Sequence, residues 1–335
     1  MRVLVVTDAW RPQINGVVRS LEHMADQAPS FGVEMTFLTP ERFRSFPMPT
    51  YPEIRLSLTR PDTVERMIAE ATPDHVHIAT EGPLGLTARL ACRRQGRVFT
   101  TSYHTRFPEY LSARLPVPEE WSYRALRWFH REARVMMVST PSLERELSAR
   151  GFRNIVRWTR GVDTTLFRPR HERVVDFPGP IFLYVGRIAV EKNLEAFLSL
   201  DLPGTKVVVG DGPARQELER QHVGVRFLGS LAGEDLARVY SSADVFVFPS
   251  LTDTFGIVLL EALASGLPIA GFPVTGPVDV INSSGCGVVD EDLRKAALAA
   301  LDVPRDLCRA YGETFTWRES ARQFFSNIQA AHTGA

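Results

Sequence analysis

Several features are scarce or absent in this sequence. Its three cysteines, Cys92, Cys286 and Cys308, are scattered along 335 residues without the spacing of a metal site or redox motif, so we expect reduced, structural thiols. No uninterrupted apolar stretch reaches the roughly 18 residues of a membrane-spanning helix, and the run from Met1 to Val6 is too short for a signal peptide. These absences predict a cytoplasmic protein.

Lysine is also scarce, because Lys192, Lys206 and Lys295 are the only lysines beside 36 arginines. The net charge is zero, but residues 1–168 hold 24 arginines, no lysine and 18 acidic residues, a net charge of +6, and the remainder carries −6. This asymmetry has two interpretations. Either the first half meets an anionic surface, nucleic acid or lipid headgroups, or it carries a surplus of solvated arginines.

Apolar runs of strand length alternate with stretches long enough for helices. The continuous β-branched runs without polar alternation are typical of strands buried on both faces of a parallel sheet. The predicted strands are Val3 to Thr7, Val33 to Leu38, Asp74 to Ile78, Val98 to Ser102, Val135 to Ser139, Ile181 to Val185, Val207 to Val209, Val225 to Leu228, Val245 to Phe248 and Leu267 to Gly271. The fold class is therefore α/β, with doubly wound, Rossmann-like architecture.

Chain length and punctuation predict two such domains and a terminal helix. A length of 335 residues suits two α/β domains, and the polar and Pro/Gly-rich stretch after Thr159 marks a boundary. We expect an N-terminal domain over 1–166, a second domain over 170–312 and a C-terminal segment, 313–335, that contains a helix from Trp317 to Ala331.

Asn15 and Gly16 stand where the first strand turns into the first helix. Ligands of doubly wound folds bind at this edge of the sheet, and a residue without Cβ lets the backbone approach a ligand closely. The following helix presents N–H groups and a positive dipole end to an anion. The alternative is an ordinary turn glycine, since no Gly-x-Gly-x-x-Gly fingerprint is present.

Arg187 and Lys192 flank the start of the second domain. Arg187 ends a strand, and Lys192 opens what we expect to be the next helix. Two cations near a helix N-terminus suit a diphosphate. The alternative is a surface pair between Glu191 and Lys192.

A third candidate segment runs from Asp253 to Glu261. Gly256 stands at an expected helix start, Ile257 and Val258 form the first turn, and Glu261 lies inside the helix among apolar neighbours. A buried carboxylate requires partners, and a ribose diol would supply them. Asp253 can bind sugar hydroxyls while the first-turn N–H groups face a diphosphate; alternatively it merely caps the helix.

In the first domain, His104 follows a predicted strand and should face the ligand cleft. A histidine there can donate to a sugar oxygen or to developing charge, or it can be a packing histidine.

The stretch from Trp121 to Met137 carries arginines at helical spacing beside Trp121, Trp128 and Phe129. This pattern is typical of helices at anionic membranes and also of solvated helix faces. Nucleic acid is disfavoured, because no stacking platform or helix-turn-helix accompanies them.

Together these segments resemble the retaining family-4 glycosyltransferases of GT-B fold over nearly the whole chain. More narrowly, the chain is similar to bacterial glycolipid synthases, the sulfoquinovosyl-, mannosyl- and glucosyl- or glucuronosyl-diacylglycerol transferases. The motifs that carry the narrower resemblance are Phe46-Pro47-Met48-Pro49 with Tyr51-Pro52-Glu53, Ser102-Tyr103-His104-Thr105 and Arg160-Gly161-Val162-Asp163.

The resemblance implies two facing Rossmann-like domains, a terminal helix that crosses back onto the first, and a nucleotide-sugar donor held mainly by the second. Arg187 and Lys192 would hold the diphosphate, Glu261 the ribose and Asp253 the sugar, and Gly16 would close over the phosphates. His104 matches the family's cleft histidine. Asp253 replaces the usual Glu, which shortens its reach by a methylene.

The implied activity is hexosyl transfer to a lipid acceptor such as diacylglycerol, with peripheral contact at the inner face of an anionic membrane. We expect no cofactor or metal requirement and favour a UDP-sugar over a GDP-sugar. The alternatives are a soluble or polysaccharide acceptor, a GT-B-like nucleotide-sugar epimerase, and a non-catalytic nucleotide-sugar-binding protein. A glycosidase is disfavoured, because Asp253 and Glu261 would lie about 11 to 12 Å apart.

Overall fold

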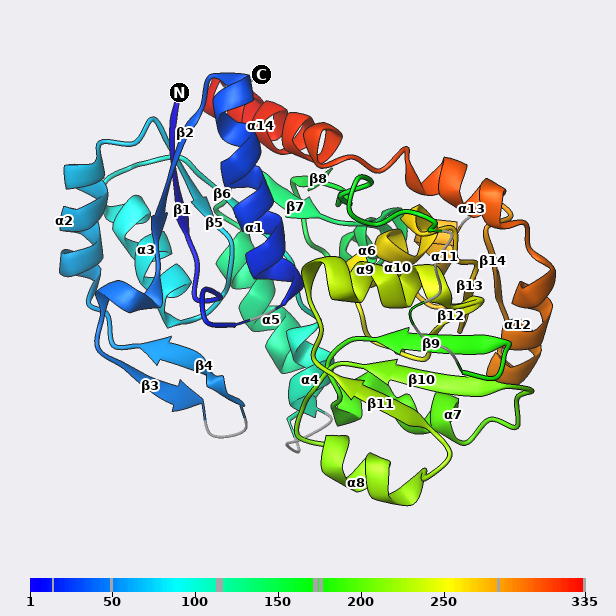
Figure 1. Cartoon of the computed structure of the whole chain (residues 1–335). Helices are drawn as coiled ribbons and strands as arrows, with labels where there is room; N and C mark the ends of the chain where they lie inside the picture. Colours follow the sequence, from blue (N-terminus) through cyan, green and yellow to red (C-terminus); the bar gives the residue numbers. More distant parts are fainter. Residues whose placement is uncertain are drawn as a thin grey trace. The chain divides into compact units, whose positions relative to one another are not determined.

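The computed structural model describes residues 1–13, 15–48, 51–112, 117–170, 174, 177–281 and 284–333. The chain divides into two compact units (Figure 1): unit 1 is Met1–Arg160 with Trp317–Ala335, and unit 2 is Gly161–Thr316. The chain therefore leaves unit 1 after Arg160 and returns after Thr316, whereas the domain ends predicted from the sequence are 166 and 312.

Unit 1 is built on a six-stranded parallel sheet in the order β2-β1-β5-β6-β7-β8. Its strands are β1 (Arg2–Val6), β2 (Glu34–Leu38), β5 (His75–Ile78), β6 (Phe99–Ser102), β7 (Met136–Val138) and β8 (Ile155–Arg157). β1, β5, β6 and β7 are almost wholly buried, as expected of strands covered on both faces. The five predicted strands of this unit are confirmed.

The helices of unit 1 begin largely where the sequence offers a suitable first turn. Asn15 caps α1, Thr140 caps α6, and prolines stand in the first turns of α2, α3 and α6. The helices are α1 (Gly16–Gln27), α2 (Pro61–Ala71), α3 (Pro83–Arg94), α4 (Phe107–Ser112), α5 (Glu119–His130), α6 (Pro141–Ala149) and α14 (Trp317–Thr333), with 3-10 turns η1 (Ala28–Phe31) and η2 (Pro40–Arg42).

The terminal helix α14 packs on unit 1, beside α1 and against β5 and β6 (Figure 1). Its apolar face is buried through Phe324, whose ring lies 4.5 Å from that of Trp158, and its first residue, Trp317, stacks on His23 of α1 at 4.2 Å. The chain thus returns to unit 1 to complete its core.

An antiparallel hairpin of β3 (Ser45–Met48) and β4 (Tyr51–Ser57) also belongs to unit 1. The sequence does not predict this hairpin, because three prolines in the stretch argue against strands. The first motif of the narrower resemblance falls on this hairpin, and its Pro49 lies outside the described residues.

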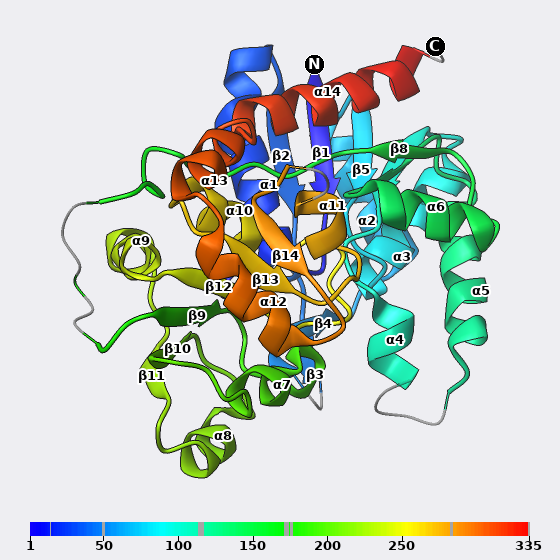
Figure 2. The same ribbon diagram turned by 90° about the vertical axis from the view of Figure 1, so that its right-hand side faces the viewer.

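Unit 2 repeats the architecture, with the parallel order β11-β10-β9-β12-β13-β14 that Figure 2 shows from the side. Its strands are β9 (Ile181–Val185), β10 (Thr205–Val209), β11 (Arg226–Gly229), β12 (Val245–Phe248), β13 (Ile269–Gly271) and β14 (Gly287–Val289). Its helices are α7 (Leu194–Leu198), α8 (Arg215–Gln221), α9 (Gly233–Ser242), α10 (Ile257–Ala264), α11 (Pro277–Ile281), α12 (Leu293–Ala299) and α13 (Arg305–Gly312), with 3-10 turns η3 (Val190–Lys192) and η4 (Ala300–Asp302).

The strand order of each sheet reverses direction once. In unit 1 the reversal lies between β1 and β5, and in unit 2 between β9 and β12. Ligands of doubly wound sheets bind beyond the carboxyl ends of the strands at such a reversal. None of the helices in the described ranges has the length and apolar character needed to cross a membrane.

Candidate active site

The reversal point of the unit 2 sheet brings together the loops after β9 and β12. Arg187 follows β9 by two residues, and the hydroxyl of Tyr184 donates to the Arg187 carbonyl at 2.8 Å, which fixes this turn. Asp253 lies in the loop between β12 and α10. Both side chains therefore come from the edge where the fold class places a ligand.

Lys192 joins this group, although not from a helix as the sequence predicts. It ends the 3-10 turn η3, Asn193 follows in the left-handed region at φ 52°, and α7 begins only at Leu194. The next helix therefore begins after Lys192 and not at it. Asn193 Nδ2 donates to the Pro249 carbonyl at 3.1 Å, so the turn is anchored to the loop after β12.

The ammonium group of Lys192 pairs with the carboxylate of Asp253. Nζ lies 2.5 Å from Oδ1, and the two side chains are only 20% and 18% exposed. The hydroxyl of Thr252 also donates to the Glu191 carbonyl at 3.4 Å. Lys192 and Asp253 thus form an ion pair. The sequence predicts that Lys192 binds phosphate and that Asp253 binds the sugar.

Helix α10 starts directly beside this pair. Its N-cap is Gly256, in the left-handed conformation at φ 85° and ψ 81°, and no side chain caps it. A Cβ at Gly256 would lie 3.0 Å from the Phe248 ring, so both backbone and packing favour glycine. Asp253 is therefore not the helix cap. The N–H groups of Ile257 and Val258 have no carbonyl within the helix to bond to, a general property of a helix start.

Glu261, in the middle of α10, is 3% exposed. The hydroxyl of Tyr240, itself fully buried in α9, donates to Glu261 Oε2 at 2.9 Å. The sequence indicates that this carboxylate needs a partner but does not indicate Tyr240, which is 21 residues away. One oxygen of the carboxylate is thus held by the protein itself.

In unit 1, Asn15 is the cap of α1. Its Oδ1 accepts hydrogen bonds from the N–H groups of Val17 and Val18, both at 3.0 Å, and its Nδ2 donates to Gln13 Oε1 at 3.0 Å. Gly16 is the first residue of α1. The side chain of Asn15 therefore satisfies two of the N–H groups at the start of α1 that the sequence predicts as ligands for an anion.

His104 lies two residues beyond the end of β6 and is 9% exposed. Its Nδ1 lies 3.0 Å from Nη2 of Arg160, and its ring stands edge-on to Trp158, with centroids 5.5 Å apart. Burial, with the positive charge of Arg160 as the next cause, holds the pKa of His104 well below its ordinary value. The imidazole is therefore neutral at physiological pH.

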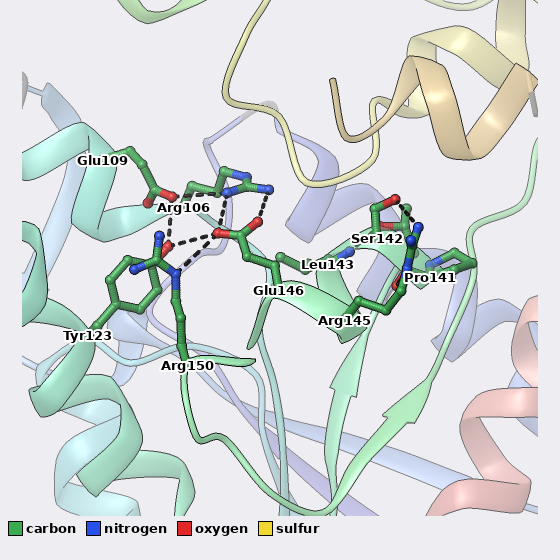
Figure 3. A network of polar contacts seen from close by, with 10 residues as sticks. Arg106, Glu109, Tyr123, Pro141, Ser142, Leu143, Arg145, Glu146 and Arg150 are labelled. Carbon is green, nitrogen blue, oxygen red and sulfur yellow. Dashed lines mark hydrogen bonds and ion pairs between the residues drawn. The ribbon is translucent and has the colours of Figure 1, made fainter. Parts of the chain in front are cut away.

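The segment after His104 is fixed by an ion-pair network (Figure 3). Arg106 Nη2 lies 2.7 Å from Glu146 Oε2, and Nη1 lies 3.0 Å from both Glu146 Oε1 and Glu109 Oε1. Tyr123 donates to Glu109 at 2.7 Å, and Arg150 stacks over the Tyr123 ring at 3.9 Å. Sequence reasoning missed this network, which ties the start of α4 to α5 and α6.

Asp8 is a second acidic group that sequence reasoning missed. Its carboxylate, beyond the end of β1, accepts from the N–H groups of Leu84 and Gly85 at 2.8 and 3.0 Å and from the Thr80 hydroxyl at 3.0 Å. These bonds satisfy the N-terminus of α3. A Cβ at Gly82 would lie 2.4 Å from Asp8 Cγ, which explains the glycine there.

Two family models match the chain. "Glycosyltransferase Family 4" matches residues 14–166, and "Glycosyl transferases group 1" matches residues 179–303. The sulfoquinovosyl transferase SQD2 of Arabidopsis thaliana is 33% identical over 81% of this chain, which spans 58% of that protein. A GDP-mannose-dependent alpha-mannosyltransferase of Mycobacterium tuberculosis (strain CDC 1551 / Oshkosh) is 32% identical over 86% of this chain and 83% of its own length. The chain belongs to family 4 of the glycosyltransferases.

A solved structure confirms the fold of this family-4 glycosyltransferase. Sucrose-phosphate synthase from Thermosynechococcus elongatus superposes over 100% of both chains with a TM-score of 0.79 at 19% identity. The predicted GT-B fold is thereby confirmed. The family models and the relatives confirm the predicted enzyme class, a hexosyltransferase.

The structure divides the predicted site residues of this glycosyltransferase between its two units. Unit 2 brings Arg187, Lys192 and Asp253 to the reversal point, beside the α10 residues Gly256, Ile257 and Val258, with Glu261 further along α10. Unit 1 holds Asn15, Gly16 and His104.

The predicted basic stretch of the glycosyltransferase is shorter than expected. α5 ends at His130, so Trp121 to Met137 is not one helix, and Met136 already belongs to β7. Trp121 is 66% exposed and Trp128 42%, whereas Phe129 is buried. Arg127 pairs with Glu120 at 2.7 Å and the guanidinium of Arg89 stacks on Trp128 at 3.9 Å, so part of this surface is already engaged.

Proposed function

We propose that this glycosyltransferase moves a hexosyl group, of the glucose, glucuronate or mannose type, from a nucleoside diphosphate to a diacylglycerol-type lipid, with retention of configuration. One observation carries the proposal: Lys192 pairs with Asp253 in the loop before α10, and Arg187 follows β9 at the same reversal point of the unit 2 sheet. Cations beside uncapped helix N–H groups form a diphosphate site, and a neighbouring carboxylate can accept bonds from sugar hydroxyls.

Each part of the donor has a partner of matching chemistry. Arg187, Lys192 and the N–H groups of Ile257 and Val258 bind the diphosphate, because all of them donate hydrogen bonds to anionic oxygens. Glu261 is a buried carboxylate that accepts from Tyr240, and carboxylate oxygens are acceptors that suit the hydroxyls of a ribose diol. Asp253 accepts from the sugar once the diphosphate competes for Lys192.

The reaction is a displacement on the face from which the diphosphate leaves. The bond between the anomeric carbon and the β-phosphate oxygen breaks, a bond to the acceptor hydroxyl forms, and the departing phosphate takes the acceptor proton. Arg187, Lys192 and the helix N–H groups offset the charge that develops on this phosphate, without a requirement for a metal ion. His104, which is neutral, donates a hydrogen bond to a sugar oxygen.

The lipid acceptor is supported by the exposed surface of α5. Trp121 and Trp128 are exposed beside the exposed arginines Arg124 and Arg131. Aromatic rings and arginines together suit the interface of an anionic bilayer. The surface belongs to the unit whose sequence carries the excess of arginine.

Four donors tested in parallel separate the alternatives. Purified protein is incubated with UDP-glucose, UDP-glucuronate, UDP-galactose or GDP-mannose, with and without diacylglycerol in anionic vesicles, while nucleotide release and lipid products are followed. We expect one donor to give a glycolipid with the donor's anomeric configuration, also in the presence of a chelator. An inverted product overturns the stereochemical proposal, and loss of activity that a divalent ion restores overturns the metal-free mechanism.

The same assay tests the acceptor. The lipid proposal would be replaced by one of its rivals if the assay showed transfer to a soluble sugar, donor conversion without acceptor, or donor binding without turnover.

The double variant Trp121→Ser/Trp128→Ser tests the membrane surface and should bind vesicles more weakly than wild type. The matched control is Val223→Ser, which removes an 84% exposed apolar side chain from unit 2. Equal vesicle binding by the two variants contradicts the membrane surface.

A further inference from the structure

Arg160, which ends the first segment of unit 1, is a buried cation whose described hydrogen bonds involve no carboxylate. Its side chain is 5% exposed, and Nη1 donates to the carbonyls of Trp158 at 2.7 Å and Thr159 at 3.3 Å. Nη2 donates to Nδ1 of His104. Burial lowers the pKa of Arg160 to about 9. An arginine placed in this way costs stability, so ion pairing does not explain its presence.

The contact with Arg160 determines which nitrogen of His104 carries the proton. A guanidinium group has N–H donors and no acceptor, so Nδ1 must accept through its lone pair. The proton of the neutral ring therefore lies on Nε2. The opposite tautomer would direct an N–H at a cation 3.0 Å away.

The Trp158 ring contacts both the Arg160 guanidinium and the His104 imidazole. The guanidinium carbon of Arg160 lies 4.2 Å from the centroid of the Trp158 ring, and His104 stands edge-on to the same ring. The imidazole of His104 is thus held by a hydrogen bond at Nδ1 and by the aromatic face beside it. Its orientation is fixed along with its tautomer.

Helix α14 holds the segment that carries Arg160. The indole N–H of Trp158 donates to the Ser320 hydroxyl at 3.1 Å, which donates to the Thr159 carbonyl at 2.8 Å. The Thr159 N–H donates to Gln323 Oε1 at 3.0 Å, and Asn327 Nδ2 donates to the Arg157 carbonyl at 2.9 Å. Ser320, Gln323 and Asn327 recur at helical spacing on one face of α14.

We propose that Arg160 is a positioning residue that fixes His104 as the neutral Nε2–H donor, and that α14 holds Arg160 in place for this purpose. The catalytic consequence rests on the proposed function, because it assumes that His104 donates to a sugar oxygen. The tautomer itself does not depend on any activity. The other titratable groups that act on His104 are His77 of β5 and His130 of α5.

The test is the imidazole nitrogen spectrum of the ligand-free protein, with His104 assigned by its loss in His104→Gln. We expect the Nε2–H pattern in wild type, mixed tautomers in Arg160→Met, and recovery of the wild-type pattern in Arg160→Lys, whose ammonium also only donates. The control Arg153→Met, which removes an exposed arginine of the same unit, should retain the wild-type pattern. An Nδ1–H pattern in wild type, or an unchanged spectrum in Arg160→Met, overturns the proposal.

Kinetics separates this inference from the proposed function. With the donor at saturation, Arg160→Met should lower kcat by about tenfold or more while the donor KM stays within about twofold, as expected when a hydrogen-bond donor is misdirected. If the wild type turns over no donor but the spectra behave as stated, the proposed function fails and the positioning of His104 stands.

If Arg160→Met does not fold, Ser320→Ala provides the second test, because it loosens the 157–160 segment without removing the guanidinium. We expect it to broaden or mix the His104 tautomers, and unchanged spectra count against the role of α14.

Discussion

Nζ of Lys192 lies 2.5 Å from Oδ1 of Asp253 and joins the turn after β9 to the loop before α10. The two residues are 61 positions apart, and neither is more than 20% exposed. A diphosphate that binds to Lys192 must share or replace Asp253. The pair therefore couples phosphate binding to the availability of a carboxylate for the sugar.

Lys192→Met should weaken binding of UDP or GDP, because it removes a charge-assisted contact worth about 1.5–3 kcal/mol. This corresponds to a loss of about tenfold or more in affinity, measured by titration calorimetry. The matched control is Lys295→Met, which breaks the 2.5 Å pair between Lys295 and Asp290 on an exposed surface of unit 2. If both variants bind the nucleotide like wild type, Lys192 does not contact the diphosphate.

Asp253→Asn should separate binding from turnover. The amide no longer neutralises Lys192, so nucleotide affinity should hold or rise, while kcat falls because a sugar hydroxyl loses its anionic acceptor. Steady-state kinetics with the preferred donor measures both quantities. A rise in KM with unchanged kcat would mean that Asp253 contributes only to ground-state binding.

Tyr240→Phe should destabilise the protein, because it deprives the buried Glu261 carboxylate of a donor that now lies 2.9 Å away. The expected loss in the free energy of unfolding is about 1–3 kcal/mol, measured by urea denaturation. Tyr311→Phe is the control, since it removes the same atom from a partly exposed ring in the same unit. Equal losses in the two variants would show that the bond to Glu261 contributes little.

Two buried histidines of β5 predict acid sensitivity. Burial lowers the pKa of His75 to about 4 and that of His77 to about 3. The unfolded chain protonates both near their ordinary pKa of 6.5, so the folded state binds fewer protons below that pH. Stability should therefore be full above pH 6.5 and fall toward pH 4, with a slope of up to about 1.4 kcal/mol per pH unit for each histidine.

Urea midpoints at about pH 7.5 and 5.5 measure this loss. His77→Gln removes one of the buried histidines with a lowered pKa, so its midpoint should change less between these pH values than that of wild type. Its own midpoint at the higher pH is the reference, which cancels any packing defect. Equal changes in the two proteins would assign the acid sensitivity to other groups.

The three cysteines should be unreactive in the folded protein. Cys92, Cys286 and Cys308 are free and fully buried, and burial raises the pKa of Cys92 and Cys308 to about 12, so these two remain thiols at neutral pH. We expect a maleimide to label none of the three in the native state and all three in denaturant. Rapid native labelling of any of them would show that its surroundings open.

The sequence predicted the elements whose signal is local. Buried central strands such as β1 and β9 are continuous apolar runs. Asn15 predicts the start of α1, because its side chain caps the N–H groups of Val17 and Val18. The edge strands β8 and β14 escaped prediction, because each has three residues that are largely half-buried, which gives no continuous apolar run.

The candidate site divides along the same line. Arg187 and Asp253 could be placed at the ligand edge of the sheet, because each lies in the loop that follows a buried strand. The contacts that set the state of these groups were not visible, because Tyr240 reaches Glu261 across 21 residues and Arg160 reaches His104 across 56. No periodicity in one sequence encodes such pairs.

Unit 1 is discontinuous in the chain, because all of unit 2 lies between Arg160 and Trp317. During synthesis the ribosome therefore releases every strand of unit 2 before α14 exists. Domains made from one continuous segment fold in order from the N-terminus. In this chain unit 2 can complete its folding before unit 1. Trp158 and His77 of unit 1 stay uncovered until α14 emerges from the ribosome. This waiting interval is the stage of biogenesis at which a chaperone would be most useful to the chain.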